Sequence, residues 1–398
     1  MNIADILLFD LDGVLLNSAG YHRSLIETVR QLSLTLGFGD RGLTQQEIDA
    51  FEASDITAEW DSSALCAALL LITAWEAHDE VALPHRLPLG KARRRRHAFP
   101  DVLAFLRGLD GRATSDPLPV AEALLLGRLD GRPDRAAAIQ SLLRDSRRLD
   151  VSLTFRLVQV YNLGSERFAR IYGEAAGFET PSFLETYDRP TLTDEERSRL
   201  HRHLRLGGRS AAIVTNRPSS SGGGLYGTPE AEIGVNVAGF ADLPRIASGD
   251  LGWRAREAGL DEGTFLKPSP VHVLAGLRVA VGDSTSGAID AAARLAQFGA
   301  GDAAWRDFDG ARIALFEDAP KGHASATSAV EILRAFGVRV RLEGFGIAAA
   351  PAKVAALAAA GARTFPHVRE ALDAASPGWR NSEARSEKQD EPAFRRRA

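Results

Sequence analysis

Cysteine is almost absent from this chain of 398 residues, and its scarcity excludes two kinds of site. Cys66 is the single cysteine, so the chain can form no internal disulfide and no cage of thiolate ligands for zinc. It lies in the apolar run ALCAALLLITAW, which we expect to belong to a hydrophobic core.

A large excess of one charge and long apolar runs are also missing. The formal charge of −4 gives no overall attraction to nucleic acid or to an anionic membrane. The basic run at residues 93–96 is interpreted as a solvated surface segment, and no nucleic-acid partner is expected. No apolar run approaches the ~20 residues that cross a bilayer, and the start MNIADILLFDLDG lacks the features of a signal peptide. We therefore expect a cytoplasmic protein with no membrane partner.

Lysine is scarce as well, because nearly all the basic residues are arginine. The lysines are Lys91, Lys267, Lys321, Lys353 and Lys388. A lysine that stands next to other candidate site residues therefore merits attention.

Apolar residues make up 45% of the chain, which is enough to form a sizeable core. The length of 398 residues predicts two domains. The run IADILLF at residues 3–9 predicts a buried parallel strand. Helical spacing follows from Tyr21, with a capping box at Thr44-Gln-Gln-Glu47. Further helices are expected after it, and the last of them is at 152–173. No convincing strand is predicted among these helices.

From about residue 190, beginning with a second capping box at Thr193-Asp-Glu-Glu196, strands and helices alternate. Strands are predicted at 211–215, 243–248, 311–316, 338–343 and 364–367, and helices at 251–259, 268–282, 324–336 and 351–361. Such alternation predicts an α/β fold, a Rossmann-like three-layer parallel sheet core with an inserted all-α domain.

The expected organisation has four parts. The core comprises residues 1–16, with the first strand, and residues 191–377. The helical domain occupies 17–190, and a polar, disordered tail occupies 378–398. Residues 80–150, rich in Arg, Pro and Gly, match no pattern that indicates a role.

Two acids follow the first strand in the segment LLFDLDGVLLNS. Asp10 and Asp12 come at the carboxyl end of a buried strand, where open α/β sheets bind ligands. Gly13 permits a sharp turn, so both carboxylates can point into one crevice. Two carboxylates this close repel each other unless a cation or a shared proton compensates.

The stretch FDLDGVL at residues 9–15 resembles the first motif of the haloacid dehalogenase-like hydrolase superfamily. It is most similar to the branch with a helical cap inserted after that motif, which includes phosphoglycolate phosphatase and β-phosphoglucomutase. The resemblance implies that Asp10 is a nucleophile that forms an aspartyl-phosphate, with Asp12 as the acid and base. Haloacid dehalogenases lack the second acid, so Asp12 favours phosphoryl transfer.

Two later segments resemble the second and third motifs of the same family. In AAIVTNRP, Thr215 ends a predicted strand and would hold phosphoryl oxygens, with Asn216 and Arg217 as substrate-binding residues. In FLKPSP, Lys267 precedes a predicted helix. The resemblance implies that this lysine neutralises charge on the nucleophile and the phosphoryl group.

The fourth motif, which would complete the metal site with Asp10 and Asp12, has two candidates. Asp283 in VAVGDS has a common form of that motif, but residues 268–282 read as one continuous helix that leaves no strand before it. Glu317 and Asp318 end the strand ARIALFED and resemble the branch that coordinates magnesium through adjacent acids. We favour Glu317 and Asp318, with Asp283 as the alternative.

The sequence thus predicts a hydrolase: an Mg²⁺-dependent phosphatase that acts on a small phosphorylated metabolite through an aspartyl-phosphate. Two alternatives stay open. A phosphomutase of the same branch would return the phosphoryl group to a sugar, and a catalytically silent fold would serve binding alone. Neither the substrate nor the oligomeric state follows from the sequence.

Overall fold

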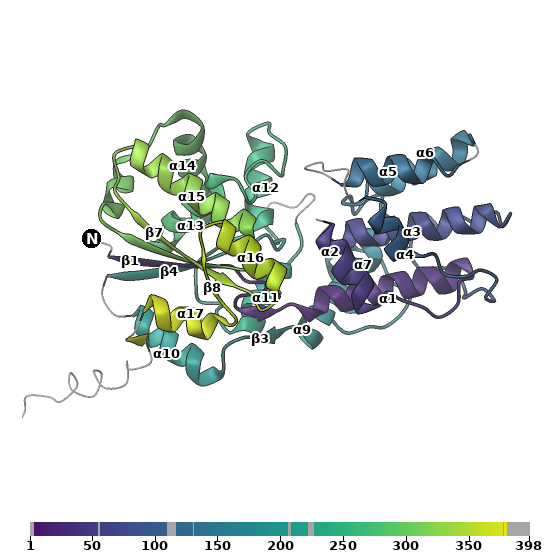
Figure 1. Ribbon diagram of the computed structural model, residues 1–398, viewed down its shortest axis with the longest axis horizontal. Helices are drawn as coiled ribbons and strands as arrows, with labels where there is room; N and C mark the ends of the chain where they lie inside the picture. Colours follow the sequence, from purple (N-terminus) through teal and green to yellow (C-terminus); the bar gives the residue numbers. More distant parts are fainter. Residues whose placement is uncertain are drawn as a thin grey trace, which may run out of the picture. The chain divides into compact units, whose positions relative to one another are not determined.

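The computed structural model describes residues 4–54, 56–109, 117–129, 131–205, 208–221, 227–376 and 378–379 (Figure 1). The chain divides into two compact units: Met1–Asn17 with Arg189–Ala398, called the sheet unit, and Ser18–Asp188, called the helical unit. Beyond residue 379, the predicted tail at 378–398 lies outside the described residues. None of the described helices combines the length and the apolar character that a bilayer crossing needs.

The sheet unit is built on strands that all pair in parallel, in the order β5-β4-β1-β6-β7-β8. The strands are β1 (Asp5–Phe9), β4 (Arg209–Val214), β5 (Arg245–Ile246), β6 (Arg312–Glu317), β7 (Arg341–Ile347) and β8 (Arg363–Phe365). The sequence of β1 is DILLF, and its last four residues are buried. A nearly continuous apolar run suits a central parallel strand, because helices cover both faces of such a sheet.

Side chains of β1 alternate between two hydrophobic cores. Ile6 and Leu8 belong to a core shared with α13 and α15, whereas Leu7 and Phe9 belong to a core shared with α10 and α17. Figure 1 shows α14 and α15 on one side of the sheet and α10 and α17 on the other. The three-layer, Rossmann-like α/β class predicted from the sequence is therefore confirmed.

The helices of the sheet unit are α10 (Asp194–Leu204), α11 (Glu230–Ala238), α12 (Ser248–Glu257), α13 (Pro270–Ala280), α14 (Thr285–Phe298), α15 (Pro320–Ala335), α16 (Pro351–Ala359) and α17 (Val368–Ala375), with a 3₁₀ turn at Ala303–Phe308. The capping box predicted at Thr193 forms at the start of α10. α15 begins at Pro320, four residues before the predicted start, because proline is well suited to the first helical position.

Two strands differ from their predicted ranges. The strand predicted at 243–248 shrinks to β5, because Ser248 already begins α12 and the Asp250 carboxylate accepts the Ala247 N–H. The strand predicted at 338–343 is β7, which starts later. The Val338 N–H donates to the Leu333 carbonyl at the end of α15, so the residues ahead of Arg341 form the turn that leaves the helix.

In the helical unit, every regular element among the described residues is a helix. These helices are α1 (Ala19–Leu36), α2 (Gln45–Ala53), α3 (Glu59–Glu76), α4 (Val102–Arg107), α5 (Leu118–Leu126), α6 (Pro133–Arg144), α7 (Leu153–Leu163), α8 (Ser165–Tyr172) and α9 (Phe183–Tyr187). α3 carries the run around Cys66, which is buried as expected, and packs against α1 and α7.

The single helix predicted at 152–173 is wrong, because Gly164 divides it into α7 and α8. Gly164 has a φ of 81° and a ψ of 149°, a conformation that only glycine adopts readily. A side chain there would also overlap the backbone of Pro181 and Ser182. The chain therefore turns where the helical spacing of the sequence continues.

A short antiparallel pair marks the point where the chain leaves the sheet unit and returns to it. β2 (Leu16–Asn17) pairs with β3 (Arg189–Pro190). The Thr191 hydroxyl adds a hydrogen bond of 2.6 Å to the Val14 carbonyl. Both ends of the helical unit are thus fixed at one place, a few residues after Asp12.

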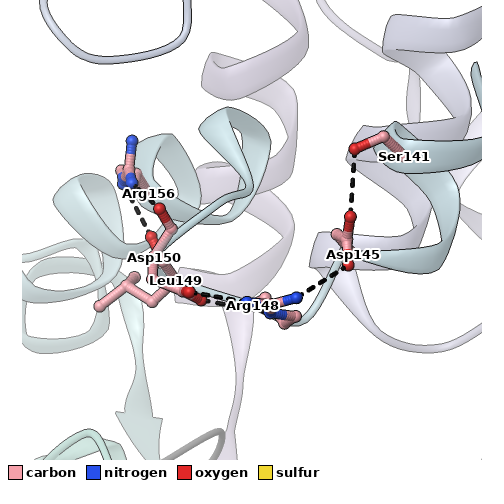
Figure 2. A network of polar contacts seen from close by, with 6 residues as sticks. All are labelled: Ser141, Asp145, Arg148, Leu149, Asp150 and Arg156. Carbon is pink, nitrogen blue, oxygen red and sulfur yellow. Dashed lines mark hydrogen bonds and ion pairs between the residues drawn. The ribbon is translucent and has the colours of Figure 1, made fainter. Parts of the chain in front are cut away.

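A buried arginine organises the loop before α7 (Figure 2). Arg156 donates through Nε to the Leu149 carbonyl at 2.7 Å, through Nη1 to the His85 carbonyl at 3.0 Å and through Nη2 to the Asp150 carbonyl. Arg148, in the same network, is half exposed and pairs with the carboxylates of Asp145 and Asp150. Arg156 therefore satisfies backbone groups and makes one ion pair, with Glu174, whereas the side chain of Arg148 makes only surface ion pairs among its described contacts.

Arg156→Met should lower the free energy of unfolding by about 1–3 kcal/mol, because it removes the donor of three partly buried hydrogen bonds and the ion-pair partner of Glu174. Arg148→Met removes only partly exposed ion pairs and should cost less than about 1 kcal/mol. Urea denaturation followed by circular dichroism measures both. Equal losses in the two variants would contradict the role assigned to Arg156.

Candidate active site

Three predicted site residues meet because their strands are neighbours. Asp10 follows β1, Thr215 follows β4 and Glu317 ends β6, and β1 pairs with both β4 and β6. The Asp10 N–H donates to the Phe316 carbonyl at 2.9 Å, which extends the ladder one residue past β1. Carboxyl ends of parallel strands lie at one edge of the sheet, so these side chains share that edge.

Lys267 connects two of these residues directly. Its Nζ donates to Oδ1 of Asp10 at 3.0 Å and to Oε2 of Glu317 at 2.7 Å. All three side chains are buried. Lys267 lies just before α13, which packs against β1 and β4 and so brings the lysine to the same edge. The structure thus joins residues that are 257 and 50 positions apart in the sequence.

The pKa values of Lys267 and Glu317 each depend on the charges of the neighbouring side chains. Burial alone lowers the pKa of Lys267, but the charges of Asp10 and Glu317 outweigh it, so the pKa is raised and the ammonium stays charged. Burial raises the pKa of Glu317 well above its usual range, and the charge of Asp10 raises it further against the opposing effect of Lys267. The negative charge at this edge is therefore only partly compensated.

Asp318 completes an acidic group that could hold a metal ion. Asp10, Glu317 and Asp318 each offer a carboxylate oxygen, and these oxygens lie within 4.8 Å of one another. Burial raises the pKa of Asp318 to about 6, the Lys353 ammonium opposes this effect, and the charge of Asp10 adds to it. Closely spaced carboxylates that resist ionisation are well suited to a hard cation, which would relieve their repulsion.

Two glycines allow this close packing. A side chain on Gly322, in the first turn of α15, would overlap the carboxylate and Cγ of Glu317. A side chain on Gly13, which has a φ of 71°, would overlap the carboxylate of Asp318. The positions of the Glu317 and Asp318 carboxylates therefore leave room only for glycine at 322 and 13.

Asp12 is held by Arg217 rather than by the acidic group. The guanidinium donates through Nε to Asp12 Oδ1 at 2.9 Å and through Nη2 to the same oxygen at 2.6 Å. Arg217 is buried, while Asn216 beside it is exposed. The Thr215 hydroxyl accepts the Arg217 N–H at 3.1 Å. Of the two predicted substrate-binding residues, Arg217 thus contacts a site residue directly.

Asp283 lies elsewhere. It follows the C-terminal end of α13, where its Oδ2 accepts a hydrogen bond of 2.5 Å from Nε of Arg278. α13 has 11 residues, a length of about 16 Å, and it starts near Lys267. The structure therefore places Asp318 beside Asp10 and separates Asp283 from it by the length of a helix.

Several residues near the acids and Lys267 were not among the site residues predicted from the sequence. His272 of α13 and His323 of α15 are buried, and their pKa values are lowered by burial and then by the Lys267 charge, to about 4 for His323. Both are therefore neutral and add no positive charge. Lys353 contacts Asp318. Only the strand order, in which β7 lies beside β6, brings Lys353 to the site, and the sequence alone does not give that order.

Comparison with known proteins gives structural likeness only. No family model matches the chain, and no curated protein matches it in sequence. A Northeast Structural Genomics Consortium target is similar with a TM-score of 0.55 and 15% identity, over 94% of this chain and 99% of that one. Phosphatase Tt82 from Thermococcus thioreducens is similar with a TM-score of 0.41 and 14% identity, over 85% of this chain and 91% of that one. The first similarity shows only a shared fold. The TM-score of the second is too low to support an argument about function.

Gly322→Ala should lower the free energy of unfolding by about 1–3 kcal/mol, because the added methyl group forces the Glu317 carboxylate away from Lys267. Gly90→Ala is the matched control: a Cβ there meets no atom within 4 Å. The control should stay within about 0.5 kcal/mol of the parent protein. Urea denaturation measures both, and an unchanged midpoint for Gly322→Ala would contradict the close packing described above.

Proposed function

We propose that this protein is an Mg²⁺-dependent phosphatase that hydrolyses a small phosphorylated metabolite through an aspartyl-phosphate on Asp10. The observation that carries the proposal is the buried contact of Lys267 with both Asp10 and Glu317. A carboxylate nucleophile beside a fixed ammonium group is suited to an anionic phosphoryl group, because the ammonium offsets the charge that accumulates as they meet.

The acidic group fits a divalent cation, because Mg²⁺ prefers hard oxygen ligands and usually takes one or two carboxylates with phosphate and water. Asp10, Glu317 and Asp318 would hold the ion. The carboxylate of Asp12, the further ligand expected from the sequence, is paired with Arg217 instead. When bound, Mg²⁺ would neutralise charge on the phosphoryl oxygens.

In the first half of the proposed reaction, an Asp10 carboxylate oxygen attacks phosphorus. The bond from phosphorus to the leaving oxygen breaks, and Asp12, which must enter this step in its protonated form, gives that oxygen its proton. Thr215 supports this step: because its oxygen accepts the Arg217 N–H, its own O–H is available to donate to a phosphoryl oxygen.

In the second half, water attacks phosphorus and Asp12, now a carboxylate, takes the proton of the water. The bond to Asp10 breaks, inorganic phosphate leaves and Asp10 is regenerated. The guanidinium of Arg217 would hold the Asp12 carboxylate in place during this step. Lys267 stays charged throughout and stabilises the negative charge shared by Asp10 and the phosphoryl group.

The helical unit would act as a cap that excludes water and selects the substrate. Support for this part comes from the chain path, because the helical unit is inserted at the β2–β3 pair, a few residues after Asp12. A unit attached there could open and close over a phosphorylated substrate. The identity of the metabolite would then depend on the helical unit.

Hydrolysis of a generic aryl phosphate, such as p-nitrophenyl phosphate, tests the proposal. In the presence of Mg²⁺, Asp318→Asn should lower kcat/KM at least about a hundredfold, because it removes a charged ligand from the site. Asp10→Asn should abolish turnover, and chelation of Mg²⁺ should have the same effect on the parent protein. Release of inorganic phosphate measures the rates.

Asp283→Asn is the matched control, since it makes the same chemical change at the far end of α13. It should keep the parent activity. Loss of activity in Asp283→Asn together with retention in Asp318→Asn would contradict the site. An aspartyl-phosphate that persists in water, and is lost only to a sugar phosphate, would instead identify a phosphomutase.

A further inference from the structure

A second lysine reaches the acidic group from another element. Lys353 lies in the first turn of α16, which follows β7, the strand beside β6. Its Nζ forms an ion pair with Oδ2 of Asp318. Lys267 contacts Asp10 and Glu317, so each of the three carboxylates has a lysine against it. This is notable in a chain with so few lysines.

The two lysines differ in how firmly they are held. The Lys267 side chain is 4% exposed and lies between two buried carboxylates. The Lys353 side chain is 44% exposed and contacts the carboxylate with the most exposed side chain of the three. A lysine stem is flexible, and an exposed ion pair gains little from being fixed. Lys267 is therefore a permanent charge of the site, and Lys353 can withdraw into solvent.

We infer that Lys353 is a displaceable counter-ion of Asp318 that a divalent cation must replace in order to bind. The inference deepens the proposed function, since it concerns the metal site on which that function depends. With all groups ionised, three carboxylates and two ammonium groups carry a formal charge of −1. Once Lys353 has withdrawn, the charge is −2, which matches a divalent cation.

Lys353 has two effects on metal binding. It pairs with Asp318, one of the carboxylates that the ion would use, so binding includes the cost of breaking the ion pair. It also reduces the repulsion among the buried acids when no ion is bound. A lysine with a purely structural role would affect stability alone, so the affinity for the metal distinguishes the two roles.

The test is isothermal titration of the full chain with MgCl₂, with no substrate present. Lys353→Met should lower the dissociation constant about threefold to tenfold, as expected for the loss of a partly exposed competing ion pair. Lys353→Arg keeps the positive charge and should bind like the parent protein. Lys321→Met is the matched control: it removes an exposed lysine from the first turn of α15 and should leave the dissociation constant unchanged.

Equal or weaker Mg²⁺ binding by Lys353→Met overturns the inference, as does the absence of binding in both it and the parent protein. A similar gain in Lys321→Met also overturns it, because a general charge effect would then explain the result. The outcome is separate from the proposed function. If Lys353→Met binds Mg²⁺ more tightly but the parent protein has no phosphatase activity, the role of Lys353 stands and the proposed function is rejected. If the parent protein is active but Lys353→Met binds Mg²⁺ with unchanged affinity, the proposed function stands and the role of Lys353 is rejected.

Discussion

The buried contact of Lys267 with Asp10 and Glu317 constrains the rest of the candidate site. Charges in an apolar interior are tolerated only when they are paired at hydrogen-bond distance, so β1, β6 and the segment before α13 must meet with little freedom. The same constraint explains why residue 322 is a glycine, because the Glu317 carboxylate fills the space that a side chain would need. Asp318 is then held one residue beyond Glu317, at the more open side of the group.

Local signals were enough to predict much of the fold. The capping boxes at Thr44 and Thr193 begin helices, and apolar runs before Asp10 and Glu317 form neighbouring strands. Features that depend on distant partners were not predictable. The β2–β3 pair joins segments on either side of the helical unit, and Gly164 breaks a helix because the backbone near Ser182 lies against it. Lys353 also needed the tertiary structure, since only the order of the strands brings α16 toward Asp318.

The two alternative acids predicted for the metal site, Asp318 and Asp283, show why the type of the preceding element matters. Parallel strands all end at one edge of the sheet, so an acid after β6 must lie near an acid after β1. The helices that connect parallel strands run back in the opposite direction, and an acid at the end of such a helix lies away from that edge. Asp283 resembles the motif in its immediate neighbours, but it follows α13, and this alone separates it from Asp10.

The β2–β3 pair has a thermodynamic consequence for the size of the insertion. Because Asn17 lies opposite Arg189, the helical unit is a loop whose two ends are already joined. The entropy lost in closing such a loop grows only with the logarithm of its length, about 0.6 kcal/mol for each doubling. A change in the length of the helical unit would therefore alter the cost of joining its ends by little. The part of the chain that would choose a substrate is free to vary in size while the charged residues of the sheet stay in place.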